Sequence, residues 1–357
     1  MFKGLLHVQC PPGERRKKSD SVRTAMNVVE LTKHLVEIDS TSGREAMVGE
    51  FLCDFLQARG FLAERQPVSA GRFNVSASMD QPEVAFSTHM DTVPPFLPVS
   101  EDAEYIYGRG ACDAKGVLAA QVHAALALAA AGHRNVGLLF VVGEESGSDG
   151  ARTANGIRTD CRYIIGGEPT DNKLALGSKG ALRFSIGTRG RAVHSAYPER
   201  GESAVETLLD VLADLRAARF PEDPVLGATT VNIGLLSGGT AANVVPDRAS
   251  AEVMVRIVTD AESMEKRILG LVRGRARVDR RFACDPIRFE TADGFDSIPV
   301  AFTTDLPLLG NWGKPFLLGP GSIFDAHGPR ERILKRDLEH AVLLYQKLAL
   351  QCMNRRS

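Results

Sequence analysis

The stretch Val84-Ala-Phe-Ser-Thr-His89-Met-Asp91-Thr-Val-Pro94-Pro95 is an apolar run that stops at a histidine. Its first residues predict a short buried strand, and the two prolines end it. Side chains alternate along a strand, so His89 and Asp91 point the same way. A histidine that binds a metal usually has a carboxylate or carbonyl at its other ring nitrogen. A lone histidine at a strand end is more often structural, so a metal site requires partners elsewhere in the chain.

Three other apolar runs predict buried strands with polar side chains just beyond them. These are residues 137–142 followed by Glu144 and Glu145, 162–165 followed by Glu168, and 315–318 followed by His327. An alanine-rich helix is predicted over 117–131. Strands that alternate with helices indicate an α/β fold with a mostly parallel sheet flanked by helices. Ligands of such sheets bind outside the carboxyl ends of the strands, so we expect these side chains around one cleft.

Asp113 lies in a glycine-rich loop just before this helix and can reach the same rim. The set then holds two histidines and three carboxylates, with one spare glutamate. Imidazole and carboxylate ligands suit Zn²⁺, Co²⁺ or Mn²⁺. Five ligands are too many for one tetrahedral ion, but they are enough for two ions if one carboxylate bridges them.

The pattern changes over residues 179–286. Alternating strands are predicted at 182–188, 229–235 and 250–258, and helices at 203–217 and 261–272. Because metal-site segments lie on both sides, we predict an inserted α+β domain within a catalytic domain made of 26–178 and 287–357. Residues 1–25 lack a clean helical or strand pattern and are predicted to be a disordered extension.

Composition excludes several classes of protein. The 357 residues carry a formal net charge of -1, which gives no reason to expect a nucleic acid or an anionic membrane as partner. The six cysteines form no CxxC pair, and no apolar run is long enough for a membrane span. A cytoplasmic location is therefore expected.

Together, the motifs resemble the M20 group of metallo-amidohydrolases, which includes acetylornithine deacetylase, succinyl-diaminopimelate desuccinylase, aminoacylase and several peptidases. The similarity runs in order from about Met26 to the C-terminus. It rests on these segments: 88–94, 108–116, 143–148, 167–170, 194–198, 238–247, Arg256, 319–323 and 326–327.

The resemblance implies a catalytic centre with two divalent ions, Zn²⁺ in the first place and Co²⁺ or Mn²⁺ as alternatives. Asp113 would bridge the ions, and the peptide bond between Asp113 and Ala114 would be cis. The remaining roles would be as follows: His89 and Glu168 on one ion, Glu145 and His327 on the other, Asp91 orienting His89, and Glu144 as general base.

The resemblance also implies that the inserted domain acts as a lid and forms a homodimer. His194 and Asn243 would then reach the active site of the partner subunit, with His194 donating to the tetrahedral oxyanion. Arg256 would hold a substrate α-carboxylate in a bidentate grip, although it could instead pair with an internal carboxylate. Gly319 and Gly321 would contact the substrate.

The chemistry of amide hydrolysis agrees with these roles. Metal ions activate water and polarise the carbonyl, and a glutamate can carry the proton of the water to the departing nitrogen. Cys112, beside Asp113, is not a candidate nucleophile because no base is predicted next to it. Ala114 and Arg330 differ from the residues common in the family, which affects the expected substrate more than the mechanism.

The predicted substrate is an N-acyl amino acid, with an activity like that of acetylornithine deacetylase, because the lid motifs resemble that branch. The alternatives are a dipeptidase or carboxypeptidase and a succinyl-diaminopimelate desuccinylase. A non-catalytic metal-binding relative is a further alternative, but it would be expected to lack a ligand or Glu144, and this sequence retains all of them.

Overall fold

In the computed structural model, strand β4 (Val84–His89) is buried at all six residues and lies inside a seven-stranded sheet of order β1-β2-β3-β7-β4-β8-β18. It pairs in parallel with β7 (Val136–Val141) and with β8 (Tyr163–Gly166). Strand β18 (Lys314–Leu317) pairs in parallel with β8. These four strands run in one direction, so their carboxyl ends share one edge of the sheet.

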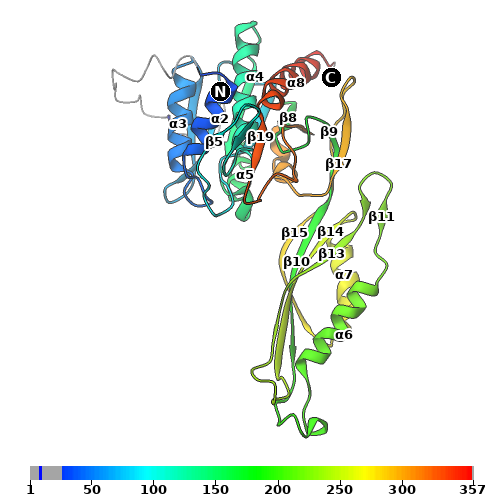
Figure 1. Cartoon of the computed structure of the whole chain (residues 1–357). Coiled ribbons are helices and arrows are strands. Elements are labelled where there is room, and N and C mark those ends of the chain that lie inside the picture. The colour runs from blue at the N-terminus through cyan, green and yellow to red at the C-terminus, as the bar shows by residue number, and fades with distance from the viewer. Residues whose placement is uncertain (1–7, 10–25, 356–357) are drawn as a thin grey trace. The chain divides into compact units, whose positions relative to one another are not determined.

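The other strands of this sheet are antiparallel. Strand β3 (Arg72–Ser78) pairs with β7, β2 (Leu62–Ser69) with β3, and β1 (Val8–Gln9) with β2. The structure describes residues 8–9 and 26–355 (Figure 1). Disorder was predicted for residues 1–25, but Val8–Gln9 form a strand, because the outer edge of β2 offers backbone groups for pairing. The rest of that predicted extension lies outside the described residues.

Helices flank this sheet, and the predicted α/β class is confirmed. They are α2 (Val28–Glu37), α3 (Ala46–Gln57), α4 (Lys115–Ala130), the short α5 (Asp149–Ala154) and α8 (Lys335–Asn354). Helices α4 and α8 lie side by side and both contact β4, whereas α3 contacts β2 and β3 (Figure 1). Helix α2 begins with a capping box in which Asn27 and Glu30 each accept a backbone N–H of the other at 2.9 Å.

Helix α4 is buried on nearly every side, with eleven of its sixteen residues inside the core. Its many alanines let α2, α8 and the sheet all approach it closely, and a helix that is apolar all round is a buried one. Because α4 is held so firmly, the loop before it, which carries Asp113, has a fixed position at the edge of the sheet.

The chain divides into two units, and each is described by itself. Unit 1 consists of Met1–Leu176, Phe289–Ile298 and Thr304–Ser357, and it contains the seven-stranded sheet. Unit 2 consists of Gly177–Arg288 and Pro299–Thr303.

Unit 2 is built on an antiparallel sheet of order β13-β14-β10-β15. The strands are β10 (Gly180–Arg189), β13 (Thr230–Gly238), β14 (Arg248–Ile257) and β15 (Arg277–Cys284). Residues alternate in burial along β10 and β14, so one face of the sheet is apolar. This face forms a core with helices α6 (Ala204–Ala217) and α7 (Ala261–Val272).

The remaining strands are short. They are β5 (Ser100–Glu101), β6 (Tyr105–Tyr107), β9 (Leu174–Ser178), β11 (Glu222–Asp223), β12 (Gly227–Ala228), β16 (Ile287–Arg288), β17 (Ser297–Val300) and β19 (Arg332–Leu334). Four 3₁₀ helices complete the described elements: η1 (Glu144–Ser146), η2 (Pro198–Arg200), η3 (Leu306–Leu308) and η4 (Gly310–Trp312). Among the described residues, no helix has both the length and the apolar character that crossing a membrane requires.

Candidate metal centre

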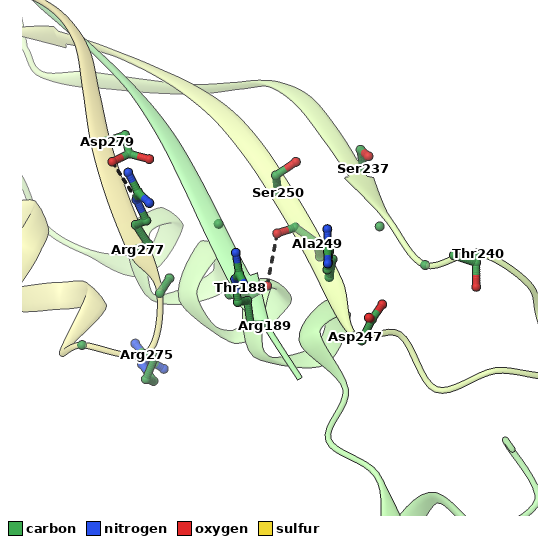
Figure 2. Close-up of a pocket in the computed structure, with 16 residues that line it drawn as sticks. Thr188, Arg189, Ser237, Thr240, Asp247, Ala249, Ser250, Arg275, Arg277 and Asp279 are labelled. Carbon is green, nitrogen blue, oxygen red and sulfur yellow. Dashed lines mark hydrogen bonds and ion pairs between the residues drawn. The ribbon is translucent and has the colours of Figure 1, made fainter. Parts of the chain in front are cut away.

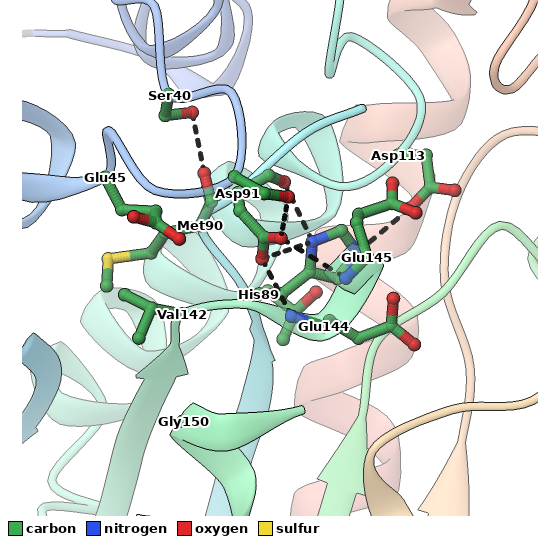
Figure 3. Close-up of polar contacts among 12 residues, drawn as sticks. Ser40, Glu45, His89, Met90, Asp91, Asp113, Val142, Glu144, Glu145 and Gly150 are labelled. Atoms are coloured by element: carbon green, nitrogen blue, oxygen red, sulfur yellow. Dashed lines mark hydrogen bonds and ion pairs between the residues drawn. The ribbon is translucent and has the colours of Figure 1, made fainter. Parts of the chain in front are cut away.

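His89 is the last residue of β4, and its buried imidazole is held from both sides. Its Nδ1 lies 2.9 Å from the backbone carbonyl oxygen of Asp91 and 3.5 Å from the Asp91 carboxylate. Its Nε2 lies 3.0 Å from Oδ1 of Asp113 (Figure 3). The ring orientation therefore depends on the Asp91 carbonyl more than on the carboxylate, and Nε2 faces the cluster of acids.

Asp113 presents its two carboxylate oxygens to two different histidines. Oδ1 faces His89, and Oδ2 lies 3.3 Å from Nε2 of His327. The peptide bond between Asp113 and Ala114 is cis, as predicted. A carboxylate that offers one oxygen to each of two imidazole-bearing sites has the arrangement that a bridging ligand requires.

Two glutamates complete the group. Oε1 of Glu145 lies 2.9 Å from Nε2 of His327, and Oε2 of Glu168 lies 4.0 Å from Nε2 of His89. Ligand atoms of His89, Asp113 and Glu145 all lie within 4.8 Å of one another. The structure thus brings together all five residues that were predicted as metal ligands.

The electrostatics of this cluster fit a site for cations. Burial raises the pKa of Glu168 well above its usual value, and the negative charge of Asp113 raises it further. Burial alone would lower the pKa of His89, but its hydrogen bonds to Asp113 and Asp91 raise it well above the usual value. So many carboxylates in one buried place repel each other, and divalent ions bound by them would remove that repulsion.

His327 is the most accessible member, with a side chain that is 49% exposed. Hydrogen bonds to Asp113 and Glu145 raise its pKa to about 10. Its backbone lies in the left-handed region with φ of 60°, which non-glycine residues seldom adopt outside special sites.

Asp91 has a role that the sequence did not reveal. Its fully buried carboxylate accepts the backbone N–H of Glu144 at 3.0 Å and of Glu145 at 3.2 Å, and the Ser42 hydroxyl donates to it at 2.7 Å. Asp91 therefore holds the start of η1, from which the two glutamates diverge (Figure 3). Glu144 is half-buried, and the partial loss of water around its carboxyl group, together with the negative charge of Asp305, raises its pKa well above the usual value.

Glu331 fixes the loop that carries Asp113. Its buried Oε1 accepts three backbone N–H groups, those of Gly110, Cys112 and Asp113, at 2.9, 3.1 and 3.0 Å. Its Oε2 accepts from the buried Arg109 guanidinium at 2.7 Å. In the sequence Glu331 stands out only as an acid four positions after His327 that the resemblance to the M20 group retains, and this does not predict such contacts.

Gly319 and Gly321 lie beside the metal ligands. A Cβ at position 319 would come within 2.4 Å of the Glu168 carbonyl oxygen, and one at position 321 within 2.6 Å of the Cys112 sulfur. Only glycine fits at these two positions, because they pack closely against Glu168 and against the Asp113 loop. Packing alone therefore explains why both residues are glycine. Their predicted contact with the substrate stays a prediction.

Unit 2 carries the other predicted residues. His194 pairs through its backbone with Val244, and the N–H of Ser195 donates to the Asn243 carbonyl oxygen at 3.0 Å. These backbone contacts join the two loops, and the side chains of His194 and Asn243 are exposed. Arg256 lies on β14 and donates to the Thr303 hydroxyl at 3.4 Å.

A wide groove of about 1130 Å³ also lies in unit 2, and it is lined by none of the predicted site residues (Figure 2). Charged side chains along it pair with acids close by. Arg277 donates to Asp279 at 2.9 Å, and Arg275 donates to Asp214 at 2.5 Å. The groove holds no histidine and no cluster of carboxylates like the one in unit 1, so it is a weaker candidate for a catalytic site than that cluster.

Comparison with known proteins assigns the chain to a family. Residues 176–277 match the peptidase dimerisation domain of M20 proteins. A peptidase M20 domain-containing protein of Schizosaccharomyces pombe is 39% identical over 337 residues, which cover 91% of this chain and 84% of that protein. The chain belongs to the M20 family.

Other M20 proteins agree with this. A probable carboxypeptidase of Uncinocarpus reesii is 36% identical over 405 residues, covering 97% of this chain and 91% of that protein. The crystal structure of an M20 family metallo-carboxypeptidase from Sulfolobus solfataricus has the same fold, with a TM-score of 0.74 at 18% identity, and it covers 92% of this chain and 100% of that one. The chain is therefore a metal-dependent hydrolase of amide C–N bonds, as predicted.

Replacing Glu331 tests its role as the support of the Asp113 loop. We expect Glu331→Ala to weaken Zn²⁺ binding by about 10- to 100-fold, the usual range for outer partners of metal ligands, because three buried N–H groups lose their acceptor. Glu331→Gln keeps one oxygen that can accept from these donors, so its loss of Zn²⁺ affinity should be smaller. Competition with a chromophoric chelator measures the affinity. Glu339→Ala, at an exposed position of α8, is the control; unchanged affinity in Glu331→Ala would contradict the role.

Proposed function

We propose that this chain is a two-metal peptidase of the M20 family that cleaves the amide bond beside a free α-carboxylate in a small peptide. The observation that supports it most is Asp113, whose two oxygens face His89 and His327. With Glu168 near His89 and Glu145 near His327, each end of the bridge has an imidazole and a carboxylate. This donor set suits Zn²⁺, with Co²⁺ and Mn²⁺ as alternatives.

The proposed reaction needs a base beside the attacking water. When bound, the two ions would lower the pKa of that water to about 7 and polarise the substrate carbonyl. Glu144 would accept the proton of the water and later donate it to the departing nitrogen. The position of Glu144 supports this role. Asp91 accepts the backbone N–H groups of both glutamates, and the side chain of Glu145 contacts His327. Glu145 therefore serves the metal centre, and Glu144 is left to accept the proton.

Residues of unit 2 would hold the substrate. We assign the α-carboxylate to Arg256, whose planar guanidinium can bind it with two hydrogen bonds. We assign the tetrahedral oxyanion to His194 of a partner subunit, with Asn243 beside it. The match of residues 176–277 to a dimerisation domain supports a homodimer. The backbone pairing of His194 with Val244, beside the hydrogen bond from Ser195 to Asn243, supports His194 and Asn243 acting together.

The choice of substrate differs from the first expectation. The lid motifs favoured an activity like that of acetylornithine deacetylase, whereas the similar fungal protein from Uncinocarpus reesii is named a probable carboxypeptidase. We therefore place peptides first and keep acetylornithine as the second candidate. Both substrates would present an α-carboxylate to Arg256. They differ in the acyl group on the other side of the scissile bond and in the side chain next to the carboxylate.

A hydrolysis panel tests this assignment. The full chain, loaded with Zn²⁺, Co²⁺ or Mn²⁺, is given simple dipeptides and tripeptides, acetylornithine, acetylcitrulline and succinyl-diaminopimelate. We expect peptides to be cleaved, chelation to abolish the activity, and metal to restore it. Faster cleavage of acetylornithine than of every peptide would move the assignment to the deacetylase. Full activity of a protein shown to be metal-free would refute the proposed mechanism altogether.

The role of Glu144 predicts a separation of metal binding from catalysis. Glu144→Ala should retain about two divalent ions per chain and lose roughly 10²–10⁴ in kcat, the usual contribution of a general base. Elemental analysis and steady-state kinetics measure the two quantities. The exposed Glu339→Ala serves again as the control. A near-normal kcat in Glu144→Ala would show that another group takes the proton.

A mixing experiment tests whether His194 acts in the partner's site. His194→Ala and Glu144→Ala homodimers should each be nearly inactive. After subunit exchange, a mixed dimer has one site with both His194 and Glu144 intact, so partial activity should return. Exchange is followed by labelling the two variants with different fluorophores. If exchange is complete and activity stays absent, His194 acts only within its own chain or not at all.

A further inference from the structure

Asp305 is a buried acid in unit 1 with no hydrogen-bond partner. Its side chain precedes η3, is 7% exposed, and neither Oδ1 nor Oδ2 makes a hydrogen bond within the described residues. Burial raises the pKa of Asp305 to about 6, and the nearby Ser148 hydroxyl, which makes no hydrogen bond to it, offsets only part of that rise. A buried carboxylate without any donor is unfavourable, so something else must supply one.

A small cavity lies in front of this carboxylate. It has a volume of about 20 Å³ and is lined by Asp305 together with Glu144, Glu168 and the carboxyl ends of the parallel strands. Of the proposed metal ligands, His89 and Glu168 line it, whereas Asp113, Glu145 and His327 do not, so it adjoins the His89 and Glu168 part of the candidate metal centre. The rest of its wall is mixed: Ser87, Thr88 and Thr304 are polar, whereas Val141, Leu306, Leu309 and Leu317 are apolar.

The size and chemistry of this cavity select its occupant. A water molecule needs a cavity of at least about 10–15 Å³ and two to four polar partners, which this cavity offers. A hard cation such as Ca²⁺ needs 6–8 oxygen ligands arranged around it, and the valine and leucine side chains that form part of the wall supply none. Water also brings two donors, and the cavity is lined by carboxylates that lack one.

We propose that a single buried water molecule occupies this cavity and donates to both Asp305 and Glu144. Through that water, Asp305 is a positioning residue for the general base. The inference rests on the proposed function in one respect, namely that Glu144 takes the proton.

Several observations agree with this link. Glu144, the first residue of η1, lines the same cavity as Asp305. The N–H of Glu144 donates to Asp91, which fixes the backbone of Glu144. Its carboxylate makes no hydrogen bond within the part of the chain that the structure describes. A donor behind that carboxylate would fix its rotamer and leave its other oxygen facing the attacking water.

The test combines crystallography and kinetics on the full chain loaded with Zn²⁺. A crystal structure at high resolution should show one water molecule within hydrogen-bond distance of both carboxylates. Asp305→Asn keeps a polar partner for the water and should stay within about fivefold of the wild-type kcat. Asp305→Leu fills the cavity and should lower kcat at least 20-fold, with KM within twofold and two Zn²⁺ per chain. Asp293→Leu, at an exposed position of unit 1, is the matched control.

Each of these measurements either supports or overturns the inference. A dry cavity, a cation in the cavity, or a kcat of Asp305→Leu within threefold of wild type overturns the inference. If Asp305→Leu fails to fold or to bind Zn²⁺, the structure of Asp305→Asn decides instead, by the presence or absence of the water. Failure of the proposed function is distinguishable, because it would leave Glu144→Ala active, whereas failure of this inference alone leaves Glu144→Ala inactive and Asp305→Leu active.

Discussion

The register of four parallel strands determines where the candidate metal centre can form. Residue His89 of β4 pairs with Val141 of β7, and Ser87 pairs with Gly166 of β8. The chain segments that follow β7 and β8 therefore leave the sheet beside His89, and they carry Glu145 and Glu168. A slip of one residue in either pairing would turn every side chain of that strand to the other face. Because β4, β7 and β8 are buried on both faces, such a slip would disrupt the close packing of side chains on both sides of the sheet.

Two acids that bind no metal in our assignment hold the ligands in place. Asp91 accepts the N–H groups of both glutamates in η1, and Glu331 accepts three N–H groups of the Asp113 loop. Hydrogen bonds to an ionised acceptor are stronger than neutral ones, and these are buried. Loops alone would place ligands imprecisely, so two carboxylates give them the fixed geometry that dinuclear binding demands.

The sequence revealed the residues that carry the chemistry better than the residues that support them. His89, Glu145 and Glu168 follow apolar strands, and this pattern follows from strand direction alone. The contacts of Asp91, Glu331 and Asp305 depend on the paths of loops, which periodicity does not describe. Strand β2 was missed because its polar residues, such as Glu64 and Arg65, obscure the alternation. The preference for a deacetylase rested on lid motifs, which do not encode the shape of the acyl pocket.

The order of the proposed ligands along the chain bears on how the protein is made. His89, Asp113, Glu145 and Glu168 all precede the long segment Gly177–Arg288 of unit 2, and His327 follows it. Domains generally fold as units while a chain is being synthesised. Until nearly all of the protein has been synthesised, the nascent chain carries only four of the five proposed ligands. The ion held by His89 and Glu168 then has its full set of ligands, whereas the other ion still lacks His327. Assembly of a complete centre is thereby delayed until unit 2, which carries His194 and Arg256, has itself been made.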